Sequence, residues 1–223
     1  MNNLRIFSLL LAAFLVASCK SSSPTEGPND IAGDVNIPIN TIGNDFSPTV
    51  YLGTSYLNIS DSMVITSNAN GLIAYKVWAN IAAYPALKAL LPANRLDASG
   101  NLNTTIHLKV TSEGIQDYRL AKSDFSKPFT IVKYSGNVGD SYQYTTADGK
   151  TVTRTVTQKS TTDDFGYGFM LIKTMTTNED NVTDISGVKA IRYITNHKFG
   201  LVQIVVVLTD NSQLKITLFP TNY

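Results

Sequence analysis

Short runs of apolar and β-branched residues, separated by turn-forming residues, dominate the chain from Val50 onward. Such runs, bounded by Gly, Asn, Asp or Pro, are typical of β-strands. Because most connections are short, consecutive strands are expected to pair in an antiparallel manner. The pattern predicts a mainly β fold, with antiparallel sheets arranged as a sandwich or a curled meander and one short helix. The predicted strands are 51–59, 62–67, 72–79, 103–111, 114–120, 129–134, 141–146, 151–159, 168–177, 188–195, 201–208 and 213–219.

The helix and one of the strands stand out from this pattern. Pro85–Leu91 is predicted to be helical, since Pro85 suits the first helical position and the leucines that follow share one face. Leu201–Leu208 is apolar at every position except Gln203. A strand that is apolar on both faces is usually covered on both sides, so we expect this strand to be central in its sheet.

Asp148-Gly149 is the strongest hairpin signal in the chain. A two-residue turn at this point would pair Tyr144 with Thr153 and Tyr142 with Thr155. One face of the hairpin would then carry Tyr and Thr, and the other Val and Arg. The alternation does not decide which of these is the core face, so the sequence specifies the register weakly here.

The first eighteen residues have the layout of a secretion signal. Arg5 supplies a positive charge, and Ile6–Val16 is apolar except for Ser8, which is too short a run to span a membrane. The segment 20–30, KSSSPTEGPND, is rich in Ser, Pro and Gly and is expected to be a flexible tether. Scattered Pro and Gly extend this tether to residue 48, with one edge strand expected around Val35–Ile39.

The chain divides into four predicted regions. These are a signal peptide at 1–18, a modified Cys19 with its tether at 19–48, an N-terminal β region at 49–124, and a C-terminal antiparallel β meander at 125–223. The sequence leaves open whether the two β regions form one domain or two. Without residues 1–18 the chain has 205 residues, with 17 basic and 17 acidic side chains. This balance, without a basic stripe, argues against nucleic-acid binding.

Val16-Ala17-Ser18-Cys19 resembles the bacterial lipobox, in which small residues precede a cysteine. The whole layout resembles uncharacterised cell-envelope lipoproteins of Bacteroidota, including the segments VGDSY at 138–142 and NHKFGLV at 196–202. The resemblance implies cleavage before Cys19, attachment of diacylglycerol to its sulfur, and a lipid anchor in the outer membrane. The alternative is a secreted protein with an ordinary cleavage site and a free Cys19 thiol. Cys19 is the only cysteine of the chain, so a disulfide within it cannot form.

Two further features bear on export and modification within this group. Members that reach the outer face often carry acidic residues after the lipidated cysteine, and Lys20-Ser21-Ser22-Ser23 has none. Asp61-Ser62-Met63 is similar to the short O-glycosylation motif of the group, which makes Ser62 a candidate modification site.

Candidate catalytic groups are few. His107 and His197 are the only histidines; the first lies within a predicted strand and the second in a turn. The chain has no G-x-S-x-G, and its histidines and single cysteine cannot supply a usual zinc site. We therefore predict no metal and no cofactor.

Carboxylates in predicted loops remain. Asp163, Asp164, Glu179, Asp180 and Asp184 could in principle supply the acid pair of a glycosidase, although exposed turns are the simpler interpretation. The oxygen-rich segments 97–103 and 180–184 could hold calcium, but the same residues close turns.

Aromatic residues offer one candidate binding site. Phe165-Gly166-Tyr167-Gly168-Phe169 is the densest aromatic group, and its glycines predict a loop with one or two exposed rings. We treat Phe165, Tyr167 and Phe169 as candidate ligand contacts, since exposed aromatic rings can stack on sugars.

These observations favour a membrane-anchored protein with a non-catalytic binding or structural role. Its expected partners are the membrane, through the N-terminal lipid, and an unidentified carbohydrate or protein. One alternative is a carrier or sensor of an apolar ligand in a half-open β-barrel. Another is a carbohydrate-processing enzyme that uses the loop carboxylates.

Overall fold

The computed structural model of the chain describes residues 29–121 and 124–222. The predicted signal peptide, Cys19 and the first part of the predicted tether lie outside these residues.

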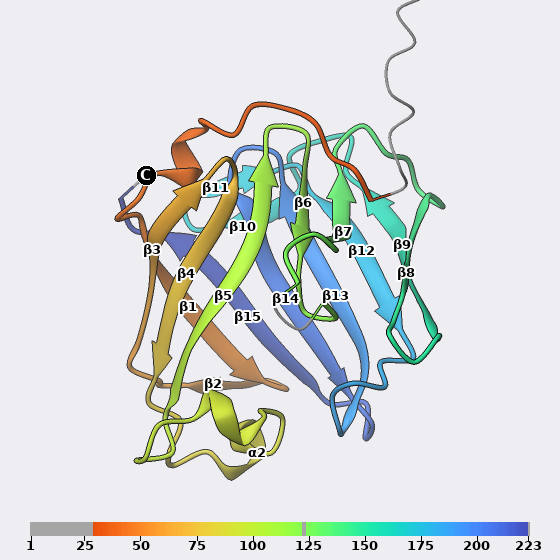
Figure 1. Cartoon of the computed structure of the whole chain (residues 1–223). Helices are drawn as coiled ribbons and strands as arrows, with labels where there is room; N and C mark the ends of the chain where they lie inside the picture. Colours follow the sequence, from red (N-terminus) through yellow and green to blue (C-terminus); the bar gives the residue numbers. More distant parts are fainter. Residues whose placement is uncertain (1–28, 122–123, 223) are drawn as a thin grey trace, which may run out of the picture.

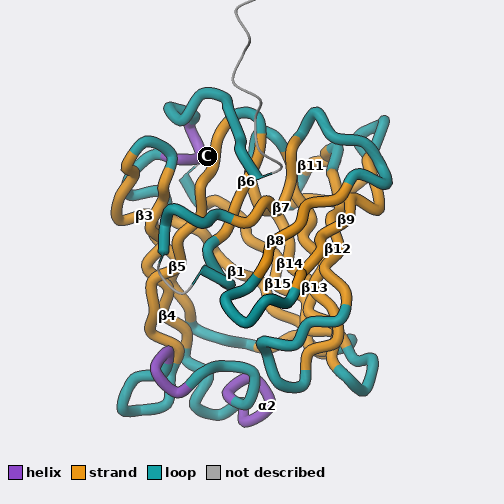
Figure 2. Tube along the Cα trace, turned by 45° about the vertical axis from the view of Figure 1, so that its right-hand side comes forward, coloured by secondary structure: helices purple, strands orange, loops and turns teal. Residues whose placement is uncertain are grey.

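The described chain forms one large antiparallel sheet of thirteen strands that curls into a nearly closed barrel (Figures 1 and 2). The strand order is β7-β6-β5-β4-β3-β1-β15-β14-β13-β12-β9-β8, and β2 pairs with β1. This arrangement confirms the predicted mainly β fold and selects a curled meander over a sandwich. β6 pairs with β7, and β1 pairs with β15, so the two predicted β regions share one sheet.

The strands of the barrel vary from three to ten residues in length. The sheet strands are β1 (Asp45–Leu52), β2 (Ser55–Leu57), β3 (Asp61–Ala69), β4 (Leu72–Ala79), β5 (Leu102–Thr111), β6 (Gly114–Asp117), β7 (Phe129–Lys133), β8 (Ser141–Thr145), β9 (Thr151–Lys159), β12 (Met175–Asp180), β13 (Val188–Asn196), β14 (Gly200–Leu208) and β15 (Gln213–Pro220). A separate hairpin consists of β10 (Phe165–Tyr167) and β11 (Met170–Ile172). The helical elements are η1 (Pro38–Asn40), α2 (Pro85–Lys88) and η2 (Ala93–Arg95).

The barrel has two ends, which we call upper and lower as in Figure 1. The upper end carries residues 29–44, the β7–β8 connection, the β10–β11 hairpin and the β13–β14 turn (Figure 1). The lower end carries β2, α2, the β8–β9 turn and the β12–β13 connection (Figure 1).

Side chains join the two ends of the sheet path, β7 and β8, and we call this junction the seam. The backbone N–H of Lys133 on β7 donates to the Tyr142 hydroxyl on β8 at 3.0 Å. Asn29 bridges the same strands: its Oδ1 accepts from Thr130 N at 3.2 Å, and its Nδ2 donates to Gln143 O at 2.7 Å. The first described residue of the chain therefore helps to close the barrel.

Residues 29–48 differ from the loose tether that the sequence predicts. Residues 29–44 follow the upper end of the barrel and bury side chains there, and residues 45–48 already belong to β1. Ile31 and Ile39 are buried, and the Asn40 side chain donates to Val35 O and Val110 O, each at 2.9 Å. The expected edge strand around Val35–Ile39 is wrong, since Pro38 instead begins the 3-10 turn η1.

The strand Leu201–Leu208 lies where its composition predicts, as part of β14 between β13 and β15. Leu201, Ile204 and Val206 pack against the main core inside the barrel. Val202 and Val205 face outward, where the β10–β11 hairpin covers them. Both faces of this strand are therefore in apolar contact.

The register of the β8–β9 hairpin differs by one residue from the predicted register. Tyr142 pairs with Arg154, and Tyr144 pairs with Val152. The connection runs from 146 to 150, because the Thr146 hydroxyl donates to Asp148 and to Lys150 O and accepts from Lys150 N. The Val/Arg face of β9 is thus the core face, and Arg154 points into the barrel.

Candidate functional site

The densest group of polar side chains in the described chain surrounds Arg154, whose side chain is completely buried. Its Nε donates to Glu179 Oε2 on β12 at 2.9 Å, and its Nη2 donates to Asp117 Oδ2 on β6 at 2.8 Å. Nη2 also donates to the Tyr193 hydroxyl at 3.1 Å, and Nη1 donates to Phe129 O at 3.2 Å. One guanidinium therefore connects β9 with four other strands.

A second arginine extends this group to the surface. Arg119 pairs with the buried Glu179 and with Asp184, which is partly exposed on the β12–β13 connection. We call Asp117, Arg119, Arg154, Glu179, Asp184 and Tyr193 the ionic network. With two guanidinium groups and three carboxylates, it places nearly balanced charge in the barrel.

The neighbouring charges and the burial of the ionic network shift the pKa values of its members. Burial disfavours the charged form of Arg154, but Asp117, Tyr193 and Glu179 outweigh burial and raise the pKa of the guanidinium. Burial raises the pKa of Tyr193 to about 12, against an opposing effect of Arg154. Both arginines therefore stay charged, and Tyr193 stays neutral, across the physiological pH range.

The ionic network links strands of the barrel through buried groups. Asp117 and Glu179 both pair with the guanidinium of Arg154, through its Nη2 and its Nε respectively. A general acid or nucleophile must reach the substrate, and both carboxylates are buried. The cation–π contacts of Arg154 with Phe129 and Tyr193 close the remaining faces of the guanidinium.

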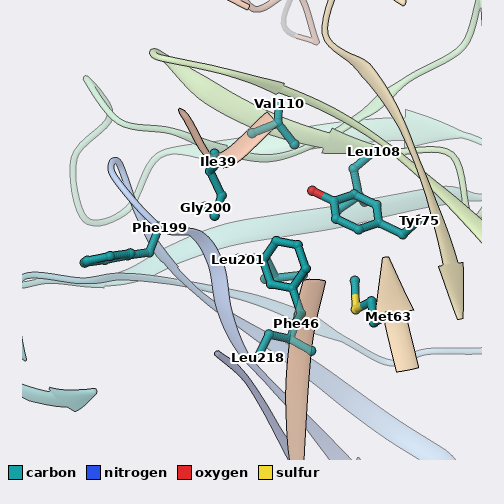
Figure 3. Close-up of a pocket in the computed structure, with 10 residues that line it drawn as sticks. All are labelled: Ile39, Phe46, Met63, Tyr75, Leu108, Val110, Phe199, Gly200, Leu201 and Leu218. Carbon is teal, nitrogen blue, oxygen red and sulfur yellow. The ribbon is translucent and has the colours of Figure 1, made fainter. Parts of the chain in front are cut away.

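The apolar interior near the upper end holds very little free space. Figure 3 shows ten residues around a cavity of about 10 Å³, which is room for roughly one water molecule. A carrier of an apolar ligand would need several hundred Å³, so this cavity does not supply what that alternative requires. The residues are Ile39, Phe46, Met63, Tyr75, Leu108, Val110, Phe199, Gly200, Leu201 and Leu218.

A more open depression of about 310 Å³ lies outside the barrel at the seam. Its walls are about half polar and half apolar, and Lys127 in it pairs with the neighbouring Asp124. The lining residues are Asn29, Asp30, Ser126, Lys127, Pro128, Gln143, Tyr144 and Thr145.

The predicted aromatic contacts are divided between the core and the surface. Tyr167 is buried against Phe199 and Phe219, and its hydroxyl donates to Leu218 O at 2.5 Å. Phe165 is partly buried beside the same cluster. Phe169 is fully exposed at the tip of the β10–β11 hairpin. The hairpin is thus fixed to the barrel by Tyr167 and presents Phe169 to its surroundings.

Of the carboxylates that the sequence singled out, Glu179 and Asp184 meet at Arg119, and Glu179 is buried in β12 rather than in the predicted loop. The others are divided between the two ends of the barrel. Asp163 and Asp164 precede the β10–β11 hairpin at the upper end, whereas Asp180 and Asp184 lie at the lower end (Figure 1). Asp164 accepts a hydrogen bond from Ser160, and Asp184 pairs with Arg119. Each of these two carboxylates thus has a local partner.

The other predicted sites have local explanations. His107 packs on Phe125 from the outer face of β5, and burial, followed by the charge of Arg95, lowers its pKa. His197 is exposed in the β13–β14 turn. Ser62 is exposed on β3 opposite Trp78, and its modification stays a prediction.

The two oxygen-rich segments, 97–103 and 180–184, are used within the fold. In the first, the Asp97 carboxylate accepts from Ser99 N and Asn101 N and so closes a turn. In the second, Asp184 pairs with Arg119. Across residues 29–121 and 124–222, no three His, Cys, Asp or Glu side chains are grouped to hold a metal ion.

No family model and no curated protein matches the chain. It is similar to the solved structure of a Bacteroides fragilis protein that is inferred to be exported and described as having a YmcC-like fold. The match covers 80% of this chain and 95% of that chain, at 9% identity and a TM-score of 0.45. This likeness does not transfer a function. Within the described residues, no helix is long and apolar enough to cross a bilayer.

Proposed function

We propose that this protein is a lipid-anchored, non-catalytic component of a bacterial cell envelope that binds or supports a partner through its outer surface. The observation that carries this proposal is the filled interior of the barrel. Apolar side chains and the ionic network occupy the space that a carrier would keep for its ligand. The most reactive groups there are bound to one another, which favours a structural role over catalysis.

The anchoring part of the proposal rests on the sequence and on where the chain joins the barrel. Val16-Ala17-Ser18-Cys19 has the pattern of a lipobox, and nine residues, 20–28, separate Cys19 from Asn29. Asn29 lies at the seam on the barrel surface. Several acyl chains on Cys19 would hold the protein at a membrane stably, whereas one chain is marginal.

Fatty-acid labelling tests the anchor. Bacteria that express the protein are grown with an alkyne-bearing fatty acid, and the wild type is compared with Cys19→Ala. We expect label on the wild-type protein in the membrane fraction and none on the variant. Equal labelling of the two proteins would refute the anchor.

A substrate panel tests the non-catalytic part. The chain from Lys20 onward is incubated with glycoside, ester and peptide substrates, and we expect no turnover. Reproducible hydrolysis that Asp163→Asn or Asp180→Asn abolishes, and that the turn variant Asp210→Asn retains, would instead support the glycosidase alternative.

A further inference from the structure

The most exposed apolar side chains of the described chain gather at one end of the barrel. Ile42, Val138, Phe169 and Leu171 are each at least 60% exposed. Ile42 precedes β1, Val138 lies in the β7–β8 connection, and the other two belong to the β10–β11 hairpin, all at the upper end (Figure 1). Adjacent exposed apolar side chains are typical of a contact surface, and Phe169 and Leu171 supply them on the hairpin.

The hairpin is built to hold its tip in place. Tyr167 is fixed in the core by its hydrogen bond to Leu218 O, and Ile172 is buried on the returning strand. Gly168 adopts φ +58°, and a Cβ at this position would lie 2.5 Å from the Phe219 ring. The turn therefore lies directly against the barrel, and Phe169, Met170 and Leu171 are exposed at and beside it.

The chain reaches the barrel at the same end. Asn29 lies at the seam, and the described segment 29–44 runs along the upper end (Figures 1 and 2). The nine residues between Cys19 and Asn29 can span at most about 35 Å when fully extended. An acylated Cys19 would therefore keep the upper end close to the bilayer.

We propose that the upper end of the barrel contacts the lipid bilayer directly, with the tip of the β10–β11 hairpin inserted at Phe169. This inference rests on the lipid anchor proposed above. Once the anchor is in the bilayer, insertion of the hairpin is an intramolecular event, so a weak apolar contact is enough to keep it populated.

The contact is apolar rather than electrostatic. Lys173 follows the hairpin, but Asp163 and Asp164 precede it at the same end of the barrel. This mixture provides little net attraction to anionic lipids. The contact is therefore expected to persist at high salt and in neutral bilayers.

Single-site labelling tests the contact in the complete mature lipoprotein. If Cys19 carries a thioether-linked lipid, a cysteine introduced elsewhere is the only free thiol. Phe169→Cys is labelled with an environment-sensitive NBD dye, and the protein is reconstituted in phosphatidylethanolamine–phosphatidylglycerol vesicles. Val138→Cys provides a second position at the upper end. Tyr56→Cys is the matched control, since Tyr56 is an aromatic residue with 57% exposure on β2 at the lower end.

We expect the dye at position 169 to become several-fold brighter in vesicles, to shift to shorter wavelength, and to be quenched by nitroxide-labelled lipids at low and high salt. The dye at position 138 should respond less, and the dye at position 56 should behave as in water. Equal responses at positions 169 and 56 would overturn the proposed contact. A dye at 169 that is protected but not quenched by the lipids would overturn it in favour of a second copy of the chain.

The protein without an introduced cysteine tests the lipid anchor separately from the bilayer contact. If it takes up the dye at Cys19 and does not float with vesicles, the anchor is wrong and the bilayer contact falls with it. If it takes up no dye and floats with vesicles, the anchor holds. The response of the dye at position 169 then tests the bilayer contact by itself.

Discussion

Replacement of Arg154 by Met is the sharpest test of how the barrel is held together. Met fills a similar volume but removes the hydrogen bonds to Asp117, Glu179 and Tyr193 and to the β7 carbonyls. Glu179 keeps its partner Arg119, whereas Asp117 loses its salt bridge with Arg154. Breaking a buried ion pair in this way costs about 3–5 kcal/mol of unfolding free energy.

For a domain of this size, such a loss lowers the melting temperature by roughly 6–20 °C. Differential scanning calorimetry of the wild type and Arg154→Met measures it. Arg192→Met is the matched control, because Arg192 is exposed on β13 and the same atoms are exchanged there. Hydrogen exchange should also accelerate at the β7 amides, since Arg154 holds the carbonyls of Phe129 and Thr130.

A second substitution separates the loss of charge balance from the loss of packing. Adding Asp117→Asn to Arg154→Met replaces the unpaired carboxylate with a neutral amide, so the double variant should be more stable than Arg154→Met alone. The explanation is refuted if Arg154→Met and the Arg192→Met control have the same melting temperature. It is also refuted if the double variant is less stable than Arg154→Met alone.

Three further predictions concern other parts of the fold. Val205→Asp places a carboxylate in the apolar cluster around Tyr167, so we expect severe destabilisation. A denaturant titration measures it, and a midpoint equal to that of the wild type would contradict the buried position of Val205 on β14. Asn29→Ala removes the two side-chain hydrogen bonds of Asn29 and should accelerate hydrogen exchange at Thr130 without a large change in melting temperature. Unchanged exchange would show that these two hydrogen bonds are dispensable. The raised pKa of Tyr193, about 12, means that its contribution to stability is complete below pH 10 and is lost as the pH rises toward 12. Tyr193→Phe should reduce this loss of stability at alkaline pH. If the variant and the wild type lose stability equally as the pH rises, ionisation of Tyr193 is not its cause.

The alternation of apolar runs and turn residues along the sequence predicted many of the strands. Leu72–Ala79 and Thr151–Lys159 occur as β4 and β9 with the predicted bounds, because turn residues mark their ends. Pro85 begins α2 as expected, although the α-helix ends at Lys88 rather than at Leu91. These features depend on neighbours in the sequence, which is why a single sequence can reveal them.

The centre of the ionic network was not predictable in the same way. In β9, Arg154 alternates with Val152 and Val156, and this spacing is the one signal that could have placed it in the core. An arginine is buried only when partners surround it, and these partners come from β6, β12 and β13. Such contacts are set by the closure of the barrel. The one-residue register error in the β8–β9 hairpin has the same origin, since both faces of β9 are locally plausible.

The bridge that Asn29 makes across the seam has a mechanical consequence. If Cys19 is fixed in a membrane, any force on the protein enters the folded part at Asn29, where the side chain connects β7 with β8. A force at this point loads a few side-chain hydrogen bonds one after another, rather than a whole strand ladder in parallel. The seam would therefore yield first under tension, while the paired strands from β6 through β1 to β9 keep their register.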